Sequence, residues 1–411
     1  MAKAKPSEKA TKSSAAKAPA VAKASAVTKL PMGKSAAPKP DNVKPADAKP
    51  SAKGNTIAGL RLKIDRIDRA LVSQMNERAR LAHKIGKIKA VSGKAAYDPV
   101  REEEVLARIA AHNKGPLSTH CLQAVYREVI SGSRALEKSL RVAHLGPAYT
   151  YSHLAAMQRF GQSVDYVPVA SIGAVFEEVN RNHCDYGLVP IENSTDGRIA
   201  DTLENFTRLP VQICGEVNLP IHHCLLGLCQ RSEVQEVYSK AQPISQCRNW
   251  LARHLPQART VEVTSTSTAA QLAKEKPGAA AIASWQAAVH YGLNLLAENI
   301  EDNQGNSTRF AVIGQHAGAK TGRDKTAIMF EVPHKPGSLA DALNLFKRAK
   351  LNLTWIESFP IARPEGGYLF FVEMEGHHSD KRVQRATERL ARRALRLTTL
   401  GSYAKATAPV G

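Results

Sequence analysis

The most regular pattern in the chain is a stripe of apolar residues in its first quarter. Its members recur at helical spacing and share one face of a helix: Ile57, Leu60, Ile64, Ile67, Leu71, Met75, Ala82 and Ile85. The pattern predicts one long helix over residues 57–89. A helix of this length has few partners in its own chain, so the stripe also predicts a dimer in which two such helices pack together.

Two cations interrupt this stripe. Arg78 and Lys89 fall where a core residue is expected, and Arg61 lies at the edge of the stripe. A cation that faces a core is costly unless an anion meets it. The alternative is that the long side chains lie along apolar surface with their charged ends in water. Three cations along one helix favour the bound anion.

Apolar periodicity divides the rest of the chain into segments of different kinds. The Asp98-Pro99 and Gly115-Pro116 breaks frame two further helices over residues 100–113 and 118–140. From residue 141, short strand-like runs alternate with helical ones, which predicts an α/β fold with parallel sheet character. A second α/β unit covers residues 220–300, and a strand at 308–313 follows it. Two such lobes normally bind a ligand in the crevice between them.

The last segment has a different element order. A linker at 314–323 precedes strand, helix, strand, strand, helix and strand, which predicts a ferredoxin-like α+β unit. The fold class is therefore multidomain, with an all-α helical part, a two-lobed α/β part of the periplasmic-binding-protein kind and the α+β part. We predict these boundaries: a tail at 1–56, and domains at 57–140, 141–318 and 325–405.

Charge is unevenly distributed along the chain. The net charge is +20, and residues 1–56 carry +9 of it through 12 Lys, no Arg and 3 acidic residues. This Ala-, Lys- and Pro-rich tail cannot form a core and is expected to be disordered, with at most nonspecific contact with nucleic acid. The remaining +11 suits small acidic substrates.

Composition also narrows the compartment and the cofactors. No run of 18 apolar residues occurs, so no membrane span is predicted. The six cysteines form no CxxC pair, which is typical of reduced thiols in a cytoplasmic protein. His222, His223, Cys224 and Cys229 do not have the spacing of a zinc site, so we expect neither a metal nor another cofactor.

Polar residues at strand ends mark a binding cleft in the α/β region. Four segments place hydroxyl or amide side chains beside turns. Such groups, together with backbone N–H groups, bind carboxylates. Each segment alone is typical of a cap or turn, but together they predict a polar cleft for a small anion. The segments are Gly146–Ser152, Val189–Gly197, Ser265-Thr266 and Asn306–Phe310.

These segments carry a resemblance to a known family. The Asn-x-Thr-Arg-Phe segment, the Pro-Ile-Glu-Asn-Ser segment and the order of the three domains resemble the bifunctional chorismate mutase–prephenate dehydratases of phenylalanine biosynthesis. The resemblance spans about residues 57–405. It implies the substrates chorismate and prephenate, no cofactor, and a C-terminal ACT domain with phenylalanine as effector.

The resemblance also implies roles for the helical residues. Arg78 and Arg101 would clamp the two carboxylates of chorismate, with Arg61 reaching from the partner chain. Lys89 would donate to the ether oxygen, and Glu102 would accept from the substrate hydroxyl. Asp98, Ser133 and Glu137 complete the family pattern. Some relatives have Gln at position 137, and a carboxyl group there donates only when protonated, so we expect mutase activity to fall as pH rises toward neutral and above.

For the dehydratase reaction the resemblance points to a second set of residues. Thr308 is the expected catalytic residue, as an oriented donor to the leaving hydroxyl. Asn193, Ser239 and Gln246 match substrate-contacting positions, and Arg309 is a candidate partner for a substrate carboxylate. The chain departs from the family pattern at Tyr149, where Gly is usual, and at Lys240-Ala241, where His-Pro is usual.

In the C-terminal unit the family's effector motifs are present in altered form. Gly337-Ser338-Leu339 and Glu357-Ser358 match effector-binding positions, whereas Phe359 stands where Arg is usual. The effector direction is therefore left open.

Three rival functions remain at this point. One is a dehydratase alone with a helical dimerisation domain, and another is a non-enzymatic amino-acid sensor. The third is nucleic-acid binding through the tail, which lacks aromatic residues for stacking.

Overall fold

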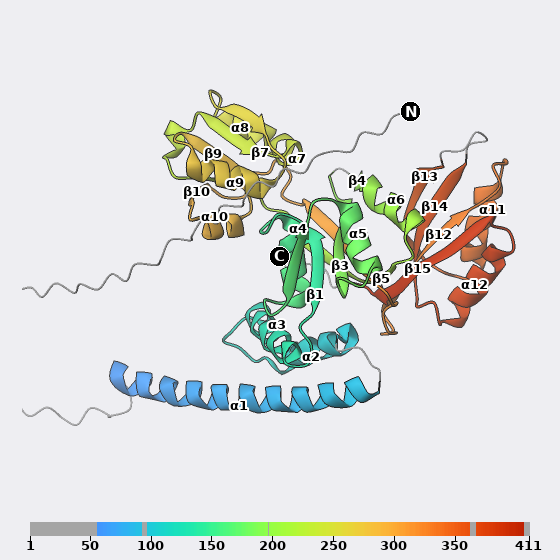
Figure 1. Cartoon of the computed structure of the whole chain (residues 1–411), viewed down its shortest axis with the longest axis horizontal. Coiled ribbons are helices and arrows are strands. Elements are labelled where there is room, and N and C mark those ends of the chain that lie inside the picture. The colour runs from blue at the N-terminus through green and yellow to red at the C-terminus, as the bar shows by residue number, and fades with distance from the viewer. Residues whose placement is uncertain (1–55, 93–96, 196, 362–366, 407–411) are drawn as a thin grey trace, which may run out of the picture. The chain divides into compact units, whose positions relative to one another are not determined.

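The computed structural model describes residues 56–92, 97–195, 197–361 and 367–406. The predicted disordered tail at 1–56 therefore lies outside the described residues, apart from Thr56. The helical region consists of α1 (Ile57–Val91), α2 (Pro99–His112) and α3 (Thr119–Ala135), as Figure 1 shows. This agrees with the predicted helices, except that α3 ends at Ala135 and not at residue 140. Residues 136–139 instead turn toward strand β1 (Arg141–Leu145), and the Asp165 N–H donates to the Leu140 carbonyl.

Local sequence explains where α2 and α3 begin. The Asp98 carboxylate accepts the N–H of Arg101 at 3.0 Å, and Pro99 occupies the first turn of α2, where no N–H is needed. Ser118 caps α3 in the same way, through the N–H of Cys121. These caps fix the starts of the helices that carry the acidic and hydroxyl groups of the helical site.

The first α/β lobe is a mixed sheet with the strand order β2-β1-β3-β11-β5. β1 pairs in parallel with β2 and β3, whereas β11 is antiparallel to both β3 and β5. The parallel character predicted from the sequence therefore holds for only part of this sheet, because β11 returns from the second lobe in the opposite direction. Its other elements are β2 (Asp165–Val169), β3 (Tyr186–Asn193), β4 (Gly197–Arg198), β5 (Gln212–Pro220), β11 (Ser307–Gly314), α4 (Tyr151–Phe160), α5 (Ile172–Asn180) and α6 (Ala200–Arg208).

The second lobe contains a sheet with the strand order β10-β6-β9-β7-β8. Its alanine-rich central strand β9 (Ala279–Ala283) is buried along its whole length, since small side chains allow helix α9 (Thr266–Glu275) to pack closely against it. The remaining elements are β6 (Cys224–Gly227), β7 (Glu236–Ser239), β8 (Arg259–Glu262), β10 (Asn294–Ala297), α7 (Ala241–Gln246), α8 (Arg248–His254), α10 (Trp285–Tyr291) and the short helix η1 (Arg231–Glu233).

The C-terminal unit has the predicted ferredoxin-like order. Its sheet runs β13-β14-β12-β15, with α11 (Ser338–Arg348) and α12 (Lys381–Ala391) on one face. The strands are β12 (Asp324–Glu331), β13 (Leu353–Pro360), β14 (Tyr368–Glu375) and β15 (Arg396–Ala404).

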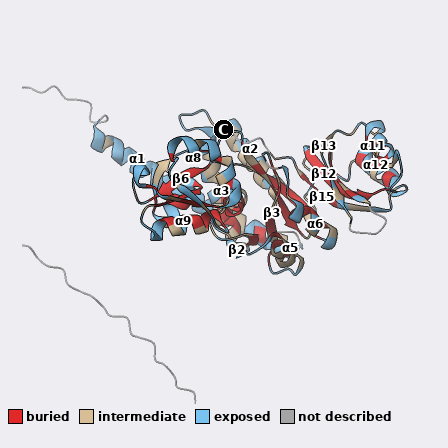
Figure 2. Ribbon diagram, turned by 90° about the horizontal axis from the view of Figure 1, so that it is seen from above, coloured by how far each residue is buried: buried red, intermediate tan, exposed pale blue. Residues whose placement is uncertain are grey.

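The other face of this sheet contributes to the core of the first lobe. Met329, Phe371 and Tyr403 belong to the same apolar cluster as Val175 and Ile213, and Figure 2 shows β3 and β12 largely buried. Strand β15 approaches β5 so closely that a Cβ on Gly401 would lie 2.1 Å from the Ile213 carbonyl oxygen. The C-terminal sheet and the first lobe therefore share one core.

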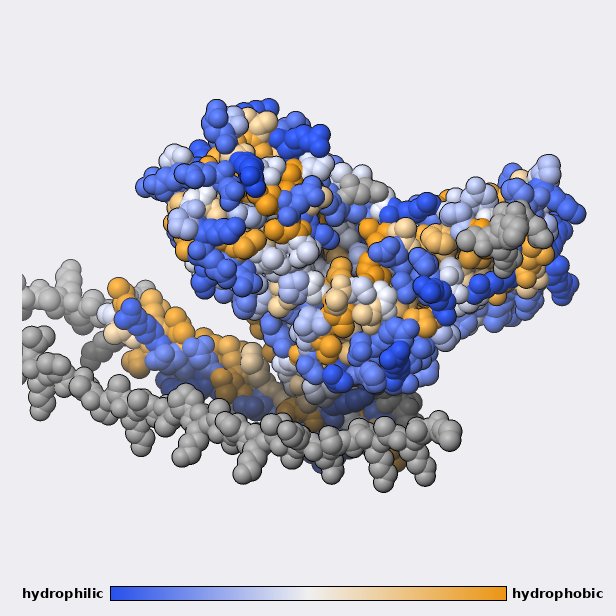
Figure 3. Space-filling model, turned by 45° about the horizontal axis from the view of Figure 1, so that its top comes forward, coloured by the Kyte–Doolittle hydropathy of each residue, from blue (hydrophilic) through white to orange (hydrophobic). Residues whose placement is uncertain are grey.

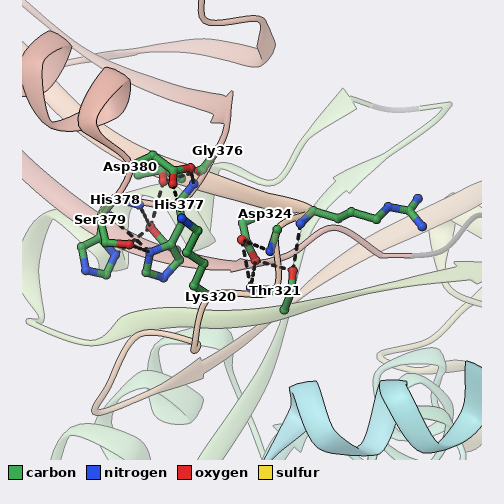
Figure 4. A network of polar contacts seen from close by, with 12 residues as sticks. Lys320, Thr321, Asp324, Gly376, His377, His378, Ser379 and Asp380 are labelled. Carbon is green, nitrogen blue, oxygen red and sulfur yellow. Dashed lines mark hydrogen bonds and ion pairs between the residues drawn. The ribbon is translucent and has the colours of Figure 1, made fainter.

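The predicted linker at 314–323 is held at its end by polar contacts. Asp324 accepts from the backbone N–H groups of Thr321 and Gly322, and Lys320 pairs with Asp380 at the start of α12 (Figure 4). The His377 N–H donates to the same Asp380 carboxylate. These bonds attach the linker to the loop between β14 and α12.

Candidate functional site

The four polar segments singled out in the sequence meet at one cavity. This interlobe cavity has a volume of about 490 Å³ and lies between the two α/β lobes. The first turns of α4, α5 and α9 line it, and two of these helices are capped by serines, Ser171 and Ser265. Helix N-termini carry partial positive charge and unpaired N–H groups, so their convergence suits an anionic ligand. Its lining includes Gly146, Thr150, Tyr151, Ser152, Pro190, Asn193, Ser265, Thr266, Thr308 and Phe310.

Strand β11 brings Thr308 to this cavity beside β3. The Asn193 side chain at the end of β3 donates to the Thr308 hydroxyl at 2.9 Å and to Asn306 Oδ1 at 3.2 Å. Thr308 is 9% exposed. A buried amide thus orients a buried hydroxyl toward the cavity, which is the arrangement expected of a positioned proton donor.

A second set of hydrogen bonds enters the cavity from the other lobe. Gln246 Oε1 accepts from Asn306 Nδ2 at 3.0 Å and lies 2.9 Å from His223 Nε2. Burial lowers the pKa of His223, so the ring is neutral near pH 7 and its Nε2–H can donate to Gln246. On its other side, Nδ1 of His223 lies 2.8 Å from the Tyr151 hydroxyl.

His223 was not among the predicted site residues, and Tyr151 was included only as part of the segment Gly146–Ser152. In the sequence, His223 stood out only as a possible metal ligand, together with His222, Cys224 and Cys229. In the structure, His222 contacts the Glu301 carboxylate at 2.8 Å, while His223 joins the polar network of the cavity. The adjacent pair of histidines before a buried strand was the feature of the sequence that could have indicated this role.

Two predicted dehydratase residues lie elsewhere. The Ser239 hydroxyl is completely buried and donates to the Ile282 carbonyl of β9 at 2.7 Å, and Ser239 is not among the residues that line the cavity. Arg309 was expected to bind a substrate carboxylate, but it is not among the residues that line the interlobe cavity. Its guanidinium lies on the opposite face of β11 from Thr308 and pairs with Glu373 of β14. Alternation of side chains along a strand is the physical reason.

Tyr149, the departure from the family pattern, adopts a left-handed backbone conformation with φ of 63°. Its ring stacks on His290 of the second lobe with a centroid distance of 4.0 Å. Its N–H donates to Nδ1 of His153, and burial lowers the pKa of His153 to about 4, which keeps this acceptor neutral. An aromatic residue therefore replaces the usual Gly in an unusual turn, and it links the two lobes.

A second cavity lies in the helical region. This helical cavity has a volume of about 260 Å³ and is bounded by α1, α2, α3 and the turn that follows α3. It brings together most of the predicted mutase residues, namely Arg78, Lys89, Asp98, Arg101, Glu102, Ser133 and Glu137. Arg61 is exposed on the first part of α1.

Contacts inside the helical cavity orient its charged groups. Arg78 Nη1 donates to the Ser133 hydroxyl at 3.0 Å, and this hydroxyl donates to the Val129 carbonyl. Glu102 pairs with Arg134, a buried residue of α3 that was not predicted from the sequence. Burial raises the pKa of Glu102, although Arg134 opposes this effect.

Glu137 differs from its neighbours. Its Oε2 atom is buried without a hydrogen-bond partner in the part of the chain that the structure describes. Gly86 on α1 makes room for it, since a Cβ on Gly86 would lie 2.4 Å from Glu137 Cγ. A buried carboxyl oxygen in a cation-lined cavity remains available for a ligand.

The apolar stripe of α1 is exposed in the single chain. Ile67 and Leu71 are 58% and 44% exposed, and Figure 3 shows hydrophobic surface along this helix. A row of large apolar side chains of this length marks an interaction surface. Among the described residues, no helix combines the length and apolar character needed to cross a bilayer.

The predicted effector residues are placed in the C-terminal unit. Gly337 has φ of 82° and precedes α11, and Leu339 lies in its first turn. Glu357 and Ser358 lie on β13, where Arg198 Nη1 contacts the Glu357 carboxylate at 3.3 Å and donates to the Ser358 carbonyl.

Comparison with known proteins assigns all three parts of the chain. Residues 60–138 match the family Chorismate mutase type II, residues 142–318 match Prephenate dehydratase, and residues 326–392 match the ACT domain. The bifunctional chorismate mutase/prephenate dehydratase of Aquifex aeolicus is 43% identical over 352 residues, covering 84% of this chain and 97% of the relative. The corresponding protein of Stutzerimonas stutzeri is 41% identical over 86% of this chain and 99% of its own length.

Solved structures agree for the part after the helical region. The prephenate dehydratase of Arthrobacter aurescens, solved in complex with L-Phe, has a TM-score of 0.61 at 31% identity, covering 66% of this chain and 94% of that chain. The enzyme of Staphylococcus aureus gives 0.58 at 31% identity, over 64% of this chain and 100% of that chain. The resemblance stated from the sequence is confirmed: the chain belongs to the bifunctional chorismate mutase/prephenate dehydratases, with both activities and a C-terminal ACT domain.

Proposed function

We propose that the two reactions take place in the two cavities described above, with chorismate bound in the helical cavity and prephenate in the interlobe cavity. Each cavity presents donors suited to a small dicarboxylate. The observation that carries this proposal is the convergence of the predicted residues, from segments far apart in the sequence, on these two hollows. Phe359 and Tyr149 do not line either cavity.

In the helical cavity the substrate itself supplies all the reacting atoms. The ether C–O bond of chorismate breaks while a C–C bond forms, and negative charge develops on the ether oxygen. Arg78 and Arg101 hold the carboxylates in the reactive geometry, and Lys89 donates to the ether oxygen together with protonated Glu137. Glu102 accepts from the substrate hydroxyl, and its pair with Arg134 keeps it in place.

In the interlobe cavity prephenate loses carbon dioxide and hydroxide. Electrons from the breaking C–CO₂ bond move through the ring and expel the hydroxyl group on the far carbon, which leaves as water once it is protonated. Thr308 donates to this leaving oxygen, with Asn193 orienting its hydroxyl. The first turns of α4, α5 and α9 hold the substrate carboxylates.

Thr308→Ala tests the dehydratase assignment. We expect dehydratase turnover to fall by about 10²-fold or more, because the oriented donor is lost, while mutase turnover is unchanged. The measurement is a paired assay on one preparation, with chorismate consumption reporting the mutase and phenylpyruvate absorbance after prephenate addition reporting the dehydratase. Equal loss of both activities would instead indicate a folding defect, and full dehydratase activity would disprove the role of Thr308.

The active unit is a homodimer in this proposal. A second copy of α1 covers the apolar stripe of the first, and Arg61 of each copy completes the helical cavity of the other. Exposure of Ile67, Leu71 and Met75 supports this arrangement.

All six cysteines are free thiols, as expected for a cytoplasmic enzyme.

Phenylalanine is the proposed effector of the ACT domain, at Gly337, Leu339, Glu357 and Ser358. Support comes from the ACT match and from the Arthrobacter aurescens relative that was solved with L-Phe. Because Phe359 replaces the usual Arg, the direction of the effect is left open. The paired assay, repeated with phenylalanine present, tests whether either activity responds.

A further inference from the structure

Full charges are scarce in the interlobe cavity, although its proposed substrate is a dianion. Among the described residues that line the cavity, Lys240 is the one side chain with a full positive charge near pH 7, and Asp201 is the one acidic side chain. His223 also lines the cavity, but burial lowers its pKa and keeps its ring neutral. The helix N-termini around the cavity contribute only partial charges. Lys240 is therefore the strongest attraction that this cavity offers to a carboxylate.

Two parallel strands of the second lobe place Lys240 at the cavity. β7 pairs with β8, and the Val263 N–H donates to the Ser239 carbonyl at 2.8 Å. Both strands end at the same edge of the sheet, so Lys240 lies beside the turn that carries Ser265 and Thr266. Ser239 is buried against β9, whereas Lys240 is exposed. The backbone is thus held in place, while the long flexible side chain can carry its ammonium group to a ligand.

Helix α7 separates Lys240 from the proposed proton donor. Lys240 immediately precedes α7, and Gln246 is the last residue of this helix. Gln246 accepts from Asn306, which in turn accepts from Asn193, the residue that orients Thr308. Six residues of α-helix rise by about 9 Å, so Lys240 and this network lie at opposite ends of α7. In prephenate both carboxylates lie at the ring carbon opposite the leaving hydroxyl, and the side-chain carboxylate is the more distant one in bonds. The two ends of α7 therefore match the two ends of the substrate.

Asp201 favours the same orientation of the substrate. It lies in the first turn of α6, in the first lobe, and lines the cavity there. A carboxylate of the substrate is repelled by this side chain and attracted by Lys240. The anionic end of the substrate is therefore directed toward the second lobe.

The chemistry of the reaction distinguishes the two carboxylates of prephenate. One is bonded to the ring and leaves as carbon dioxide, whereas the other, on the pyruvyl side chain, remains in phenylpyruvate. A cation paired with the ring carboxylate would stabilise the reactant and lose that stabilisation as the electrons move into the ring, so it would slow the reaction. A cation paired with the side-chain carboxylate keeps its partner throughout the reaction.

We infer that Lys240 binds the side-chain carboxylate of prephenate, the one that the product retains. This inference rests on the proposed binding of prephenate in the interlobe cavity. Lys240 is then a substrate-binding residue that acts on affinity and orientation and takes no part in the bond changes. It is also a position at which the sequence departs from the family pattern, so this charge is a property of the present chain.

Lys240→Met tests the inference, because it removes the charge and keeps most of the length of the side chain. We expect KM for prephenate to rise about tenfold or more with kcat little changed, since a hydrogen bond to a charged group is lost. The inhibition constant of added phenylpyruvate should rise by the same factor, because the product carries the same carboxylate. The assay follows the release of carbon dioxide, which added phenylpyruvate does not disturb. Mutase turnover of the same preparations should stay at the wild-type value.

Two further variants provide the controls. Lys240→Arg should keep both constants close to the wild-type values, because the charge is preserved. Lys274→Met removes the same charge from an exposed position of α9 in the same lobe, but Lys274 is not among the residues that line the interlobe cavity, so both constants should be unchanged.

Three results would overturn the inference. The first is an unchanged KM in Lys240→Met, and the second is an equal rise of KM in Lys274→Met, which would make net charge responsible. The third is a raised KM with an unchanged inhibition constant of phenylpyruvate, because Lys240 would then pair with the carboxylate that leaves. Full dehydratase activity in Thr308→Ala would instead refute the proposed function, so the two failures are distinguishable.

Discussion

At the residue scale, the helical cavity depends on one carboxyl group without a partner. Arg78 is oriented by Ser133, and Glu102 is held by Arg134, whereas Oε2 of Glu137 has no hydrogen-bond partner among the described residues. A ligand oxygen that gains negative charge would be repelled by this group when it is ionised and stabilised by it when it is protonated. The hydrogen-bonding capacity of this one side chain therefore matters for the proposed mutase mechanism.

Glu137→Gln is the direct test. We expect the variant to have a higher mutase kcat/KM than the wild-type protein, because a side-chain amide donates a hydrogen bond whereas a carboxylate only accepts one. The measurement is mutase kcat/KM of both proteins, with the dehydratase activity of the same preparations as the control. An unchanged mutase kcat/KM in the variant would remove Glu137 from the mechanism.

At the element scale, a glycine of α1 lies against the turn that follows α3. Gly86 is the buried residue of α1, and it faces Glu137 just beyond the end of α3. In an exposed helix Gly→Ala is favourable by about 1 kcal/mol. Here the added Cβ would lie 2.8 Å from the Glu137 Oε2 atom. The helix propensity of Ala therefore favours the substitution, whereas the position of Glu137 disfavours it.

Gly86→Ala should therefore reduce mutase turnover without unfolding the protein. The displaced Glu137 carboxyl loses its place in the helical cavity, while the dehydratase lobes are untouched. Steady-state mutase and dehydratase rates, together with a thermal melt, measure this. Gly132→Ala on α3 is the control, since its Cβ would meet nothing closer than 3.7 Å. Wild-type mutase activity in Gly86→Ala would mean that the position of Glu137 is unimportant.

At the scale of the whole molecule, the exposed stripe of α1 supports the proposed homodimer. Removing apolar surface from water is favourable by about 25 cal/mol for each Å². Two long helices that pack together remove a large apolar area, so the total stabilisation is many times this value. In a two-fold dimer each copy gives and receives the same contacts. Each site would then contain Arg78 from one chain and Arg61 from the other.

Co-expression of two inactive variants tests this arrangement. Arg61→Ala and Arg78→Ala should each lose mutase activity, because each removes a carboxylate contact. In a mixed dimer one site receives both substitutions and the other receives none, so differently tagged, co-purified mixed dimers should recover part of the activity. Dimers of either variant alone provide the control. No recovery in a mixed dimer of confirmed composition would place Arg61 in the site of its own chain or outside any site.

Much of this protein follows from its sequence alone. The apolar period predicts α1, caps such as Asp98 define helix starts, and the polar segments at strand ends predict an anion site. These features depend on residues near one another in the chain, so local physical rules are sufficient to identify them. The resemblance then supplied the two reactions and their residues.

Tertiary structure alone decided which way each side chain points and what it meets. Thr308 and Arg309 stand next to each other in one motif, yet pairing of β11 between β3 and β5 sends one to the interlobe cavity and the other to Glu373. His223 became part of the site only because folding brought it to Gln246 and Tyr151. Such contacts join residues that are distant in the sequence. A local sequence pattern therefore does not indicate which residue a buried side chain will contact.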